Sequence, residues 1–473
     1  MGDRTGLEAR RTVPLIVASA IIMQQIDSTA LATALPSIAE SFGEPALRLH
    51  SAITIYLLSL GVFLPISSWV ADRFGARLVF CAAIGIFALA SLACAASTNL
   101  ATMVLARAVQ GFGGALMLPV GRLILVRSVT QRELVSAMIL MSLPSAIGPA
   151  VGPLLGGFIT SISSWRWIFW INLPVAALGI LLTLLFIKDV EPGPRQRFDV
   201  PGFLLSGAGI GALILALDAA SHGRYGEAGG LAAAGLAATW LYVRHARREP
   251  DAILDLRLFR FPTFRASMLG GSLFRTGFSA LPFMLPLLMQ EVFGYSPLES
   301  GTITFVSAIG AFGMRTVMKR ILKRIGFRRV LVWNALIAAA SMAAYAGFTP
   351  GTAPWLMMLV IFLGGVVRAL QFTSINTLAF ADVSAPEMGH ATALSQMAQR
   401  VSQSLGVAFA ATLLHLFNGG GTHLSGFAFE AAFLVIAATA ALSCLSFVTL
   451  PPTAGDVLAG RSEPPRDETA AAR

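Results

Sequence analysis

The chain has 473 residues, of which 56% are hydrophobic and only 12% are charged. An ordinary soluble domain carries roughly 25% charged residues, so this composition excludes a soluble globular protein and indicates an integral membrane protein. The net charge of +10 would also suit a nucleic-acid-binding protein, but the placement of the basic residues between apolar segments argues against that class.

Apolar segments long enough to cross a bilayer, about 20 residues each, recur along nearly the whole chain. We predict an all-α integral membrane fold with fourteen transmembrane helices. Continuous apolar runs exclude a transmembrane β-barrel, whose segments alternate over about ten residues. The approximate ranges are 13–35, 50–70, 78–97, 101–126, 135–160, 167–187, 200–220, 228–244, 264–289, 298–318, 329–348, 353–378, 391–416 and 426–449.

The basic residues are distributed unevenly between the two sides that these helices define. If the N-terminus is cytoplasmic, most of the 34 Lys and Arg fall in the tails or in loops on the cytoplasmic side. Arg48, Arg166 and Arg224 fall on the opposite side. This bias follows the positive-inside rule, and it predicts that both termini are cytoplasmic.

A short pattern occurs twice. Residues 73–77 read Arg-Phe-Gly-Ala-Arg between the second and third helices, and residues 324–328 read Arg-Ile-Gly-Phe-Arg between the tenth and eleventh. Each copy occupies the same place in a block of six helices. We therefore predict two six-helix bundles with pseudo-two-fold symmetry, in which rocking of the halves exposes a site near the midplane alternately to each side.

The predicted units follow from this repeat. The N-terminal bundle is residues 1–190 and the C-terminal bundle is residues 260–450. Residues 191–259 hold two inserted transmembrane helices and a linker, which we expect to pack peripherally without transport chemistry. Residues 451–473 are expected to form a disordered cytoplasmic tail.

Four motifs occur in register. Asp27 to Thr29 and Ala34 to Pro36 read Asp-x-Thr and Ala-Leu-Pro in the first helix, and Ser68 to Arg77 reads Ser-x-x-Ala-Asp-Arg-x-Gly-x-Arg in a loop. Arg107 to Gly111 reads Arg-x-x-Gln-Gly in the fourth helix, and Gly148 to Gly157 is a Gly/Pro-rich run in the fifth. These motifs resemble those of the major facilitator superfamily, specifically its fourteen-helix drug:proton antiporters, although Ser68 replaces the usual opening glycine of the loop motif.

The resemblance implies a proton-coupled antiporter of the bacterial cytoplasmic (inner) membrane. It would export amphipathic drugs or toxic small molecules by alternating access, as a monomer that uses the proton gradient and no metal or other cofactor. Its partners would be a small-molecule substrate, protons and the lipid bilayer, and no nucleic acid. An enzyme is not expected, since the sequence has no Gly-x-x-x-x-Gly-Lys-Ser/Thr or His-Glu-x-x-His pattern. A receptor built on a transporter scaffold stays open.

Asp27 and Arg107 are the predicted proton-coupling pair. A charged carboxylate in hydrocarbon costs about 2.5–3.5 kcal/mol on insertion scales, so Asp27 needs a compensating partner. Burial disfavours the ionised acid and a nearby guanidinium favours it, and this competition can bring proton binding into the physiological range. The alternative is a permanent buried ion pair that never titrates.

Two further sets of residues are predicted to control the movement of the halves. An acid at the end of the second helix can pair with a guanidinium and hold the cytoplasmic side shut. Glycines at four-residue spacing in the fifth helix allow close packing, and prolines favour a bend. The cytoplasmic gate motif is Asp72, Arg73, Gly75, Arg77, Arg324, Gly326 and Arg328, and the antiporter motif is Gly148, Gly152, Pro153, Gly156 and Gly157.

Polar and aromatic residues inside the predicted spans suggest a substrate cavity, because a polar stripe in a span does not face lipid comfortably. The arginines among them have few acidic counterparts, which favours an alternative substrate, an organic anion such as a metabolite carboxylate. The predicted cavity residues are Gln24, Arg275, Phe278, Arg368, Gln371, Asn376, Gln399, Arg400 and Gln403.

Overall fold

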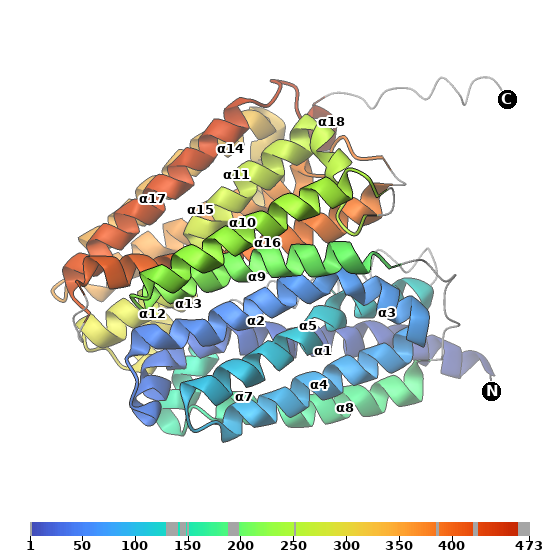
Figure 1. Cartoon of the computed structure of the whole chain (residues 1–473), viewed down its shortest axis with the longest axis horizontal. Coiled ribbons are helices and arrows are strands. Elements are labelled where there is room, and N and C mark those ends of the chain that lie inside the picture. The colour runs from blue at the N-terminus through green and yellow to red at the C-terminus, as the bar shows by residue number, and fades with distance from the viewer. Residues whose placement is uncertain are drawn as a thin grey trace.

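The computed structural model is all-helical over the residues that it describes, which are 2–128, 141, 148, 151–187, 198–249, 252–384, 387–419 and 424–461. Its helices lie side by side along one direction (Figure 1). In chain order they are α1 (Gly2–Phe42), η1 (Ala46–Leu49), α2 (His50–Phe63), η2 (Leu64–Ile66), α3 (Ser67–Phe74), α4 (Ala76–Ala96), α5 (Leu100–Ser128), α7 (Trp167–Trp170), α8 (Asn172–Phe186), α9 (Val200–Ser221), α10 (Tyr225–Ala246), η3 (Leu256–Arg260), α11 (Pro262–Ser279), α12 (Leu281–Leu287), η4 (Leu288–Val292), α13 (Pro297–Ile325), α14 (Phe327–Ala344), η5 (Tyr345–Gly347), α15 (Pro354–Leu378), α16 (Met388–Phe417), α17 (Gly426–Val448) and α18 (Asp456–Ala459).

Eleven helical stretches of the described residues are long and apolar enough to cross a membrane, so the chain is a multi-pass membrane protein. The prediction of fourteen is thus matched only in part. Of the fifth predicted span, 135–160, the structure describes an apolar helix over Val151–Ile162, and most of the remainder lies outside the described residues. The helices α10 and α16 have 22 and 30 residues but are not among the eleven.

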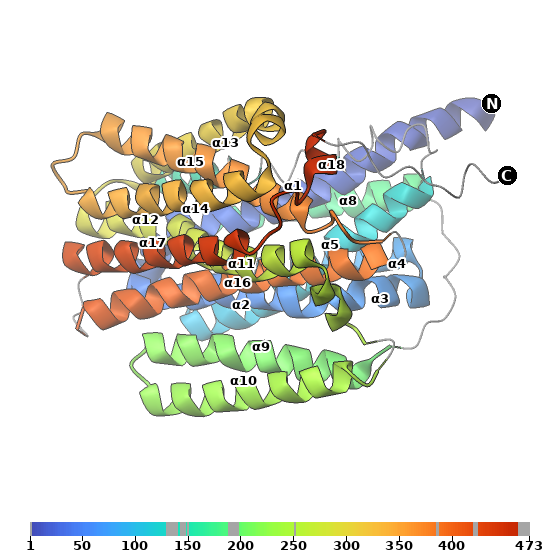
Figure 2. The same ribbon diagram turned by 90° about the horizontal axis from the view of Figure 1, so that it is seen from above.

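The helices form two groups and a separate layer. In Figure 1, α1 to α8 lie below and α11 to α17 lie above. Figure 2 shows α9 and α10 as a layer on one side of both groups, with α10 outermost. We call the end of the molecule at which α1 begins and α17 ends the near end, and the opposite end the far end.

The layer of α9 and α10 contacts both groups of helices. At the far end, Asp218 of α9 lies 3.2 Å from His50 Nε2 of α2. One residue earlier, the Leu217 carbonyl accepts a hydrogen bond from Thr412 of α16 at 3.0 Å. The helix α9 therefore connects to α2 and α16. We expected both inserted helices to be peripheral, but only α10 lies on the outside (Figure 2).

The repeated pattern adopts the same backbone conformation in both copies. Gly75 ends α3 with φ +89° and ψ 132°, and Gly326 ends α13 with φ +85° and ψ 155°. Positive φ is a conformation that residues with a Cβ adopt only at a cost. A glycine at this position lets the chain leave one long helix and enter the next within a single residue.

The arginine that follows each of these glycines also makes the same contact in both copies. Arg77, in the first turn of α4, donates to the Leu184 carbonyl near the end of α8. Arg328, in the first turn of α14, donates to the Val448 carbonyl at the end of α17 at 2.9 Å. Cationic groups stabilise the carbonyl end of a helix, so each arginine ties the third helix of a block to the sixth.

The first part of the predicted tail is folded. After α17 the chain turns at Gly455, which packs against Phe327 and Leu378. The short helix α18 follows, and Arg461 pairs with Asp456 at 3.2 Å. The remainder of 451–473 lies outside the described residues.

We expect Gly75→Ala and Gly326→Ala each to lower the melting temperature of the purified protein. A Cβ in the left-handed region costs about 1–2 kcal/mol. The matched control is Gly211→Ala, because a Cβ at Gly211 meets nothing within 4 Å and lies in a helix, where alanine is favoured. Equal melting temperatures for Gly326→Ala and Gly211→Ala would contradict the argument.

Candidate proton and substrate site

The carboxylate of Asp27 lies fully buried in the middle of α1 and accepts three hydrogen bonds. Arg107 Nη1 of α5 donates to Oδ2 at 2.6 Å. Gln110 Nε2 of α5 and Asn172 Nδ2 of α8 donate to Oδ1 at 3.0 and 2.9 Å. The predicted pair is therefore in direct contact, and two amides complete the surroundings of the acid.

The guanidinium of Arg107 is also fully buried. It lies 4.1 Å from the ring centroid of Tyr56 and donates from Nε to the Ala52 carbonyl at 3.4 Å. Its Nη2 has no hydrogen-bond partner among the described residues. The cation is held by one acid, the rings of Tyr56 and Phe169, and neighbouring oxygens. Neutralising the acid would therefore leave the guanidinium without a counter-charge.

Sequence reasoning did not assign Gln110, Asn172 or Tyr56 to this site. The signal for Gln110 was available, because residues three apart share a helix face and Gln110 follows Arg107 at that spacing. For Asn172 the signal was a buried amide in an apolar helix, which is costly unless it is bonded. Tyr56 gave no comparable signal.

The glycines of the antiporter motif let the fifth span lie directly against α1 beside Asp27. A Cβ at Gly148, Gly152 or Gly156 would overlap atoms of α1 between Gln25 and Thr33. Thr29 Oγ1 donates to the Gly148 carbonyl at 3.2 Å across this contact. The glycine face therefore sets the position of the helix that carries the acid.

The next residues of the same helix meet the second group through two reciprocal contacts. A Cβ at Gly157 would overlap the carbonyl of Pro297 at the start of α13. A Cβ at Gly301 of α13 would lie 2.6 Å from the carbonyl of Pro153. The two helices thus approach backbone to backbone, each glycine against the other helix's proline carbonyl.

Further contacts join the groups. Gln290 Nε2 of η4 donates to the Thr33 carbonyl of α1 at 3.0 Å. Ser404 Oγ of α16 donates to the Thr54 carbonyl of α2 at 2.9 Å. The helix α1 is therefore bonded to the second group less than two turns from Asp27.

In the second group, Arg275 of α11 is fully buried with an incomplete set of partners. Its Nη2 donates to Asn376 Oδ1 of α15 at 2.6 Å. Its Nε and Nη1 have no hydrogen-bond partner within the described ranges. A buried guanidinium with two unused nitrogens, each able to donate, is suited to a carbonyl, carboxylate or water that enters beside it.

Aromatic rings cluster near this arginine. The centroids of Phe274, Phe278 and Phe372 lie 5.8 to 6.1 Å apart. The guanidinium carbon of Arg368 lies 5.5 Å from the Phe278 centroid. Two short chains of contacts therefore join the predicted cavity residues of α11 to α15: Arg275 to Asn376, and Phe278 to Arg368. Their assignment to a substrate cavity stays a prediction.

The remaining cavity candidates divide into two kinds. Arg400 donates to Gln403 at 3.3 Å on α16, and both are half-buried there, as is Gln399. Gln24 and Gln371 are instead buried and bond within their own groups. Gln24 donates to the Gly114 carbonyl at 3.2 Å. Gln371 donates to the Leu331 carbonyl at 3.1 Å and accepts from Asn334 at 2.9 Å. Their amides connect helices within a group.

The loop-motif acid also bonds within its group. Asp72 accepts a hydrogen bond from Arg127 of α5 at 3.2 Å, and both side chains are partly exposed. Arg73 and Arg324 are exposed. The structure therefore shows a pair between Asp72 and α5, and no hydrogen bond or ion pair of Asp72 with the second group within the described residues.

The first group of helices encloses a buried cluster of an acid, an arginine and two amides, and the second group holds the buried Arg275. Two helical groups with buried ionisable residues are the architecture of a secondary transporter of small molecules. The chain belongs to the Major Facilitator Superfamily, whose family model matches residues 17–407 and 267–471. Members of this family are transporters and not enzymes.

Among curated proteins, the chain is 39% identical over 442 residues to the "Putative multidrug resistance protein MdtD" of Salmonella heidelberg, covering 92% of this chain and 94% of that protein. Among solved structures, it resembles the POT family transporter PepTSo with a TM-score of 0.69 at 14% identity, covering 92% and 97% of the two chains. It also resembles the nucleoside transporter NupG with a TM-score of 0.65 at 14% identity, covering 93% and 98%. The two structural matches establish the shared fold alone.

We expect Gly156→Ala to destabilise the protein and to impair transport, because the added Cβ would overlap the Ala30 carbonyl of α1, a backbone atom that cannot turn aside. Overpacking of this kind costs about 1–3 kcal/mol. The matched control is Gly85→Ala, where the nearest atom, Ile180 Cδ1, is 4.0 Å away. Thermal denaturation and substrate flux in proteoliposomes would measure both effects, and identical behaviour of the two variants would refute the packing role.

Proposed function

We propose that the protein is a proton-coupled antiporter that exports amphipathic drugs or toxic small molecules by alternating access. The observation that carries this proposal is the full burial of Asp27 with Arg107 at 2.6 Å. The contact of α1 with the fifth span and with Gln290 of the second group supports it, because movement of the halves would change the surroundings of the acid.

The proposed coupling follows from the partners of Asp27. When Asp27 is ionised, Arg107, Gln110 and Asn172 hold it. A proton from outside would neutralise the carboxylate and leave Arg107 without its counter-charge, which favours a rearrangement of this cluster. Release of the proton inside would restore the pair, and at 100 mV each proton moved inward supplies about 2.3 kcal/mol.

We propose fourteen spans, with the near end cytoplasmic. To the eleven described spans we add α10, α16 and the fifth span that contains Val151–Ile162. The helices α10 and α16 are less hydropathic than the eleven because α10 is rich in Gly and Ala and α16 carries the polar stripe around Arg400. The positive-inside bias supports the orientation, and the name of the bacterial MdtD relatives supports multidrug resistance as the function. We further propose that the protein lies in the bacterial inner membrane and works as a monomer.

We propose that the two bundles, residues 1–190 and 260–450, enclose the substrate between them. The aromatic cluster of Phe274, Phe278 and Phe372 offers polarizable surface to apolar ligands. The stripe of Gln399, Arg400 and Gln403 offers hydrogen bonds. The matching turns at Gly75 and Gly326 support the symmetry of the bundles, and Asp72 remains our proposed cytoplasmic latch.

A second candidate function is proton-coupled export of an organic anion. Arg275 favours this function. Two of its nitrogens have no hydrogen-bond partner among the residues that the structure describes, and a guanidinium can bind a carboxylate through a bidentate pair. Arg368 lies on the same wall, beside Phe278. The two candidate functions share the proton site and differ in the charge of the cargo.

We expect Asp27→Asn to abolish transport driven by a pH gradient while exchange of substrate at equal pH continues. Asparagine keeps the shape of the side chain and can still accept from Arg107, but it cannot bind and release a proton. The measurement is flux through the purified variant in proteoliposomes, after size-exclusion chromatography has shown a folded protein.

The control for that experiment is Asp218→Asn, which removes a partly exposed carboxylate from α9. It should keep gradient-driven transport, because we assign no transport chemistry to the inserted helices. Undiminished gradient-driven flux through Asp27→Asn would end the proposed role of Asp27.

We expect Arg275→Gln to reduce export of dicarboxylates and tricarboxylates at least tenfold if the cargo is an anion, since a hydrogen bond to a charged group contributes about 1.5–3 kcal/mol. Efflux of an ethidium-like cation should change little. Arg122→Gln is the control, because Arg122 is exposed on α5. Loss of cation efflux in a folded Arg275→Gln variant would contradict the assignment of Arg275 to anion binding.

A further inference from the structure

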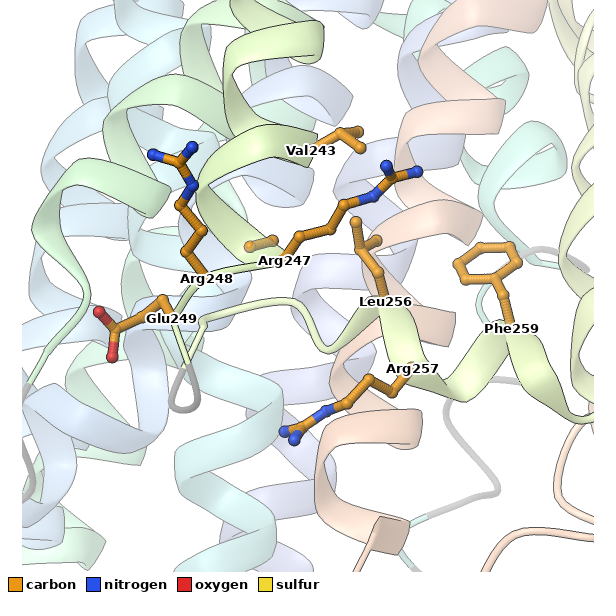
Figure 3. A pocket seen from close by; sticks show the side chains of 8 residues that line it. Val243, Arg247, Arg248, Glu249, Leu256, Arg257 and Phe259 are labelled. Carbon is orange, nitrogen blue, oxygen red and sulfur yellow. The ribbon is translucent and has the colours of Figure 1, made fainter.

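A groove lies at the near end of α10, away from the Asp27 cluster. Two hollows of about 560 Å³ and about 490 Å³ share Val243, Arg247 and Arg248 in their walls, so they adjoin. The larger hollow lies between α10 and η3, where Phe259 and Leu256 face Arg247 and Val243 (Figure 3). The smaller continues along α10 to Trp240.

Specific hydrogen bonds hold the two walls of the groove together. Tyr242 Oη of α10 donates to the Leu254 carbonyl at 2.9 Å and accepts from the Leu254 amide at 3.0 Å. Asp199 accepts from the Ile253 amide at 3.1 Å and lies 2.7 Å from His245 Nε2. The linker before η3 is therefore fixed against α10, and the groove is a built feature.

The basic side chains of the groove are largely uncompensated. No ion pair is formed with any described residue by Arg244, Arg247 or Arg248. The larger hollow is lined by one acid, Glu249. Arg257, by contrast, is paired with Asp255 at 3.0 Å. Partial burial alone would raise the pKa of Asp255, but the hydrogen bonds from Arg257 hold that pKa below its ordinary value. The remaining positive charge lies along α10.

The arrangement along α10 combines charge with apolar surface. Trp240, Arg244 and Arg247 lie at four- and three-residue spacing, which places them on one helix face, and the guanidinium of Arg244 lies 5.7 Å from the Trp240 ring. Trp240 is 59% exposed, and α10 is the outermost helix of the molecule (Figure 2). Exposed tryptophan at the end of a span is typical of the boundary between hydrocarbon and headgroups.

We propose that this groove binds one anionic glycerophospholipid. Its phosphate lies between Arg244 and Arg247, and an acyl chain follows Trp240, Val243 and Phe259 away from the charge. The occupant is a lipid rather than a soluble anion because the cationic part of the groove continues into apolar surface on the lipid-facing helix. This site is separate from the proposed transport site and does not depend on the cargo.

Native mass spectrometry of the full-length protein in detergent tests the proposal, with phosphatidylglycerol and phosphatidylcholine of the same acyl chains in equal amounts. We expect retention of phosphatidylglycerol in preference to phosphatidylcholine. Arg244→Gln/Arg247→Gln should weaken phosphatidylglycerol binding about thirtyfold, since each basic residue near an anionic surface contributes about a fivefold gain. Lys319→Gln/Arg320→Gln, which removes two exposed charges from α13, should leave it unchanged.

A second measurement locates the lipid and separates it from free phosphate. Phosphatidylglycerol with brominated acyl chains should quench tryptophan fluorescence more than brominated phosphatidylcholine, and Trp240→Phe should remove that difference. Inorganic phosphate should not compete. Equal binding of both lipids, equal loss in the two double variants, competition by inorganic phosphate, or unchanged quenching in Trp240→Phe would each overturn the proposal.

Discussion

The structure depends on one electrostatic constraint, the burial of a carboxylate in the middle of α1. An ionised acid without water must be matched by donors, and here Arg107, Gln110 and Asn172 supply them. Asn172 also lies 2.9 Å from Ser91 of α4. Through these bonds the carboxylate of Asp27 connects α1, α5 and α8 directly, and α4 through Asn172. A change in the ionisation of Asp27 therefore alters the bonding of four helices of the first group.

The two groups share a scaffold but not a chemistry. The turns at Gly75 and Gly326 and the ties made by Arg77 and Arg328 occur in both. The buried acid occurs in the first group, whereas the second carries Arg275 with two nitrogens that lack described partners. A scaffold with two-fold symmetry suits the alternating access that we propose, and the different buried residues let the two halves take different tasks within it.

Much of this arrangement could be predicted from the sequence, for physical reasons that particular residues show. Long apolar runs permit little except helices, and a buried acid demands a partner, which made Asp27 and Arg107 predictable. The direction of a polar side chain around its helix was not predictable, because it depends on which helix packs beside it. Gln24 and Gln371 were therefore expected in the cavity, although their amides bond within their own groups. Gln110 was missed although its three-residue spacing from Arg107 was visible in the sequence, and Asn172 was missed because the helix that packs beside it was unknown.

The seam between the fifth span and α13 has a mechanical consequence. Gly157 and Gly301 each face a proline carbonyl of the other helix, so backbone contacts backbone at both points. No side chains interdigitate at these two points, and a change of crossing angle there requires no rotamer to switch. The reorientation that we propose for the two halves therefore meets little steric resistance at this contact. The contact also restricts substitution at Gly157 and Gly301, because any side chain larger than hydrogen would separate the two helices.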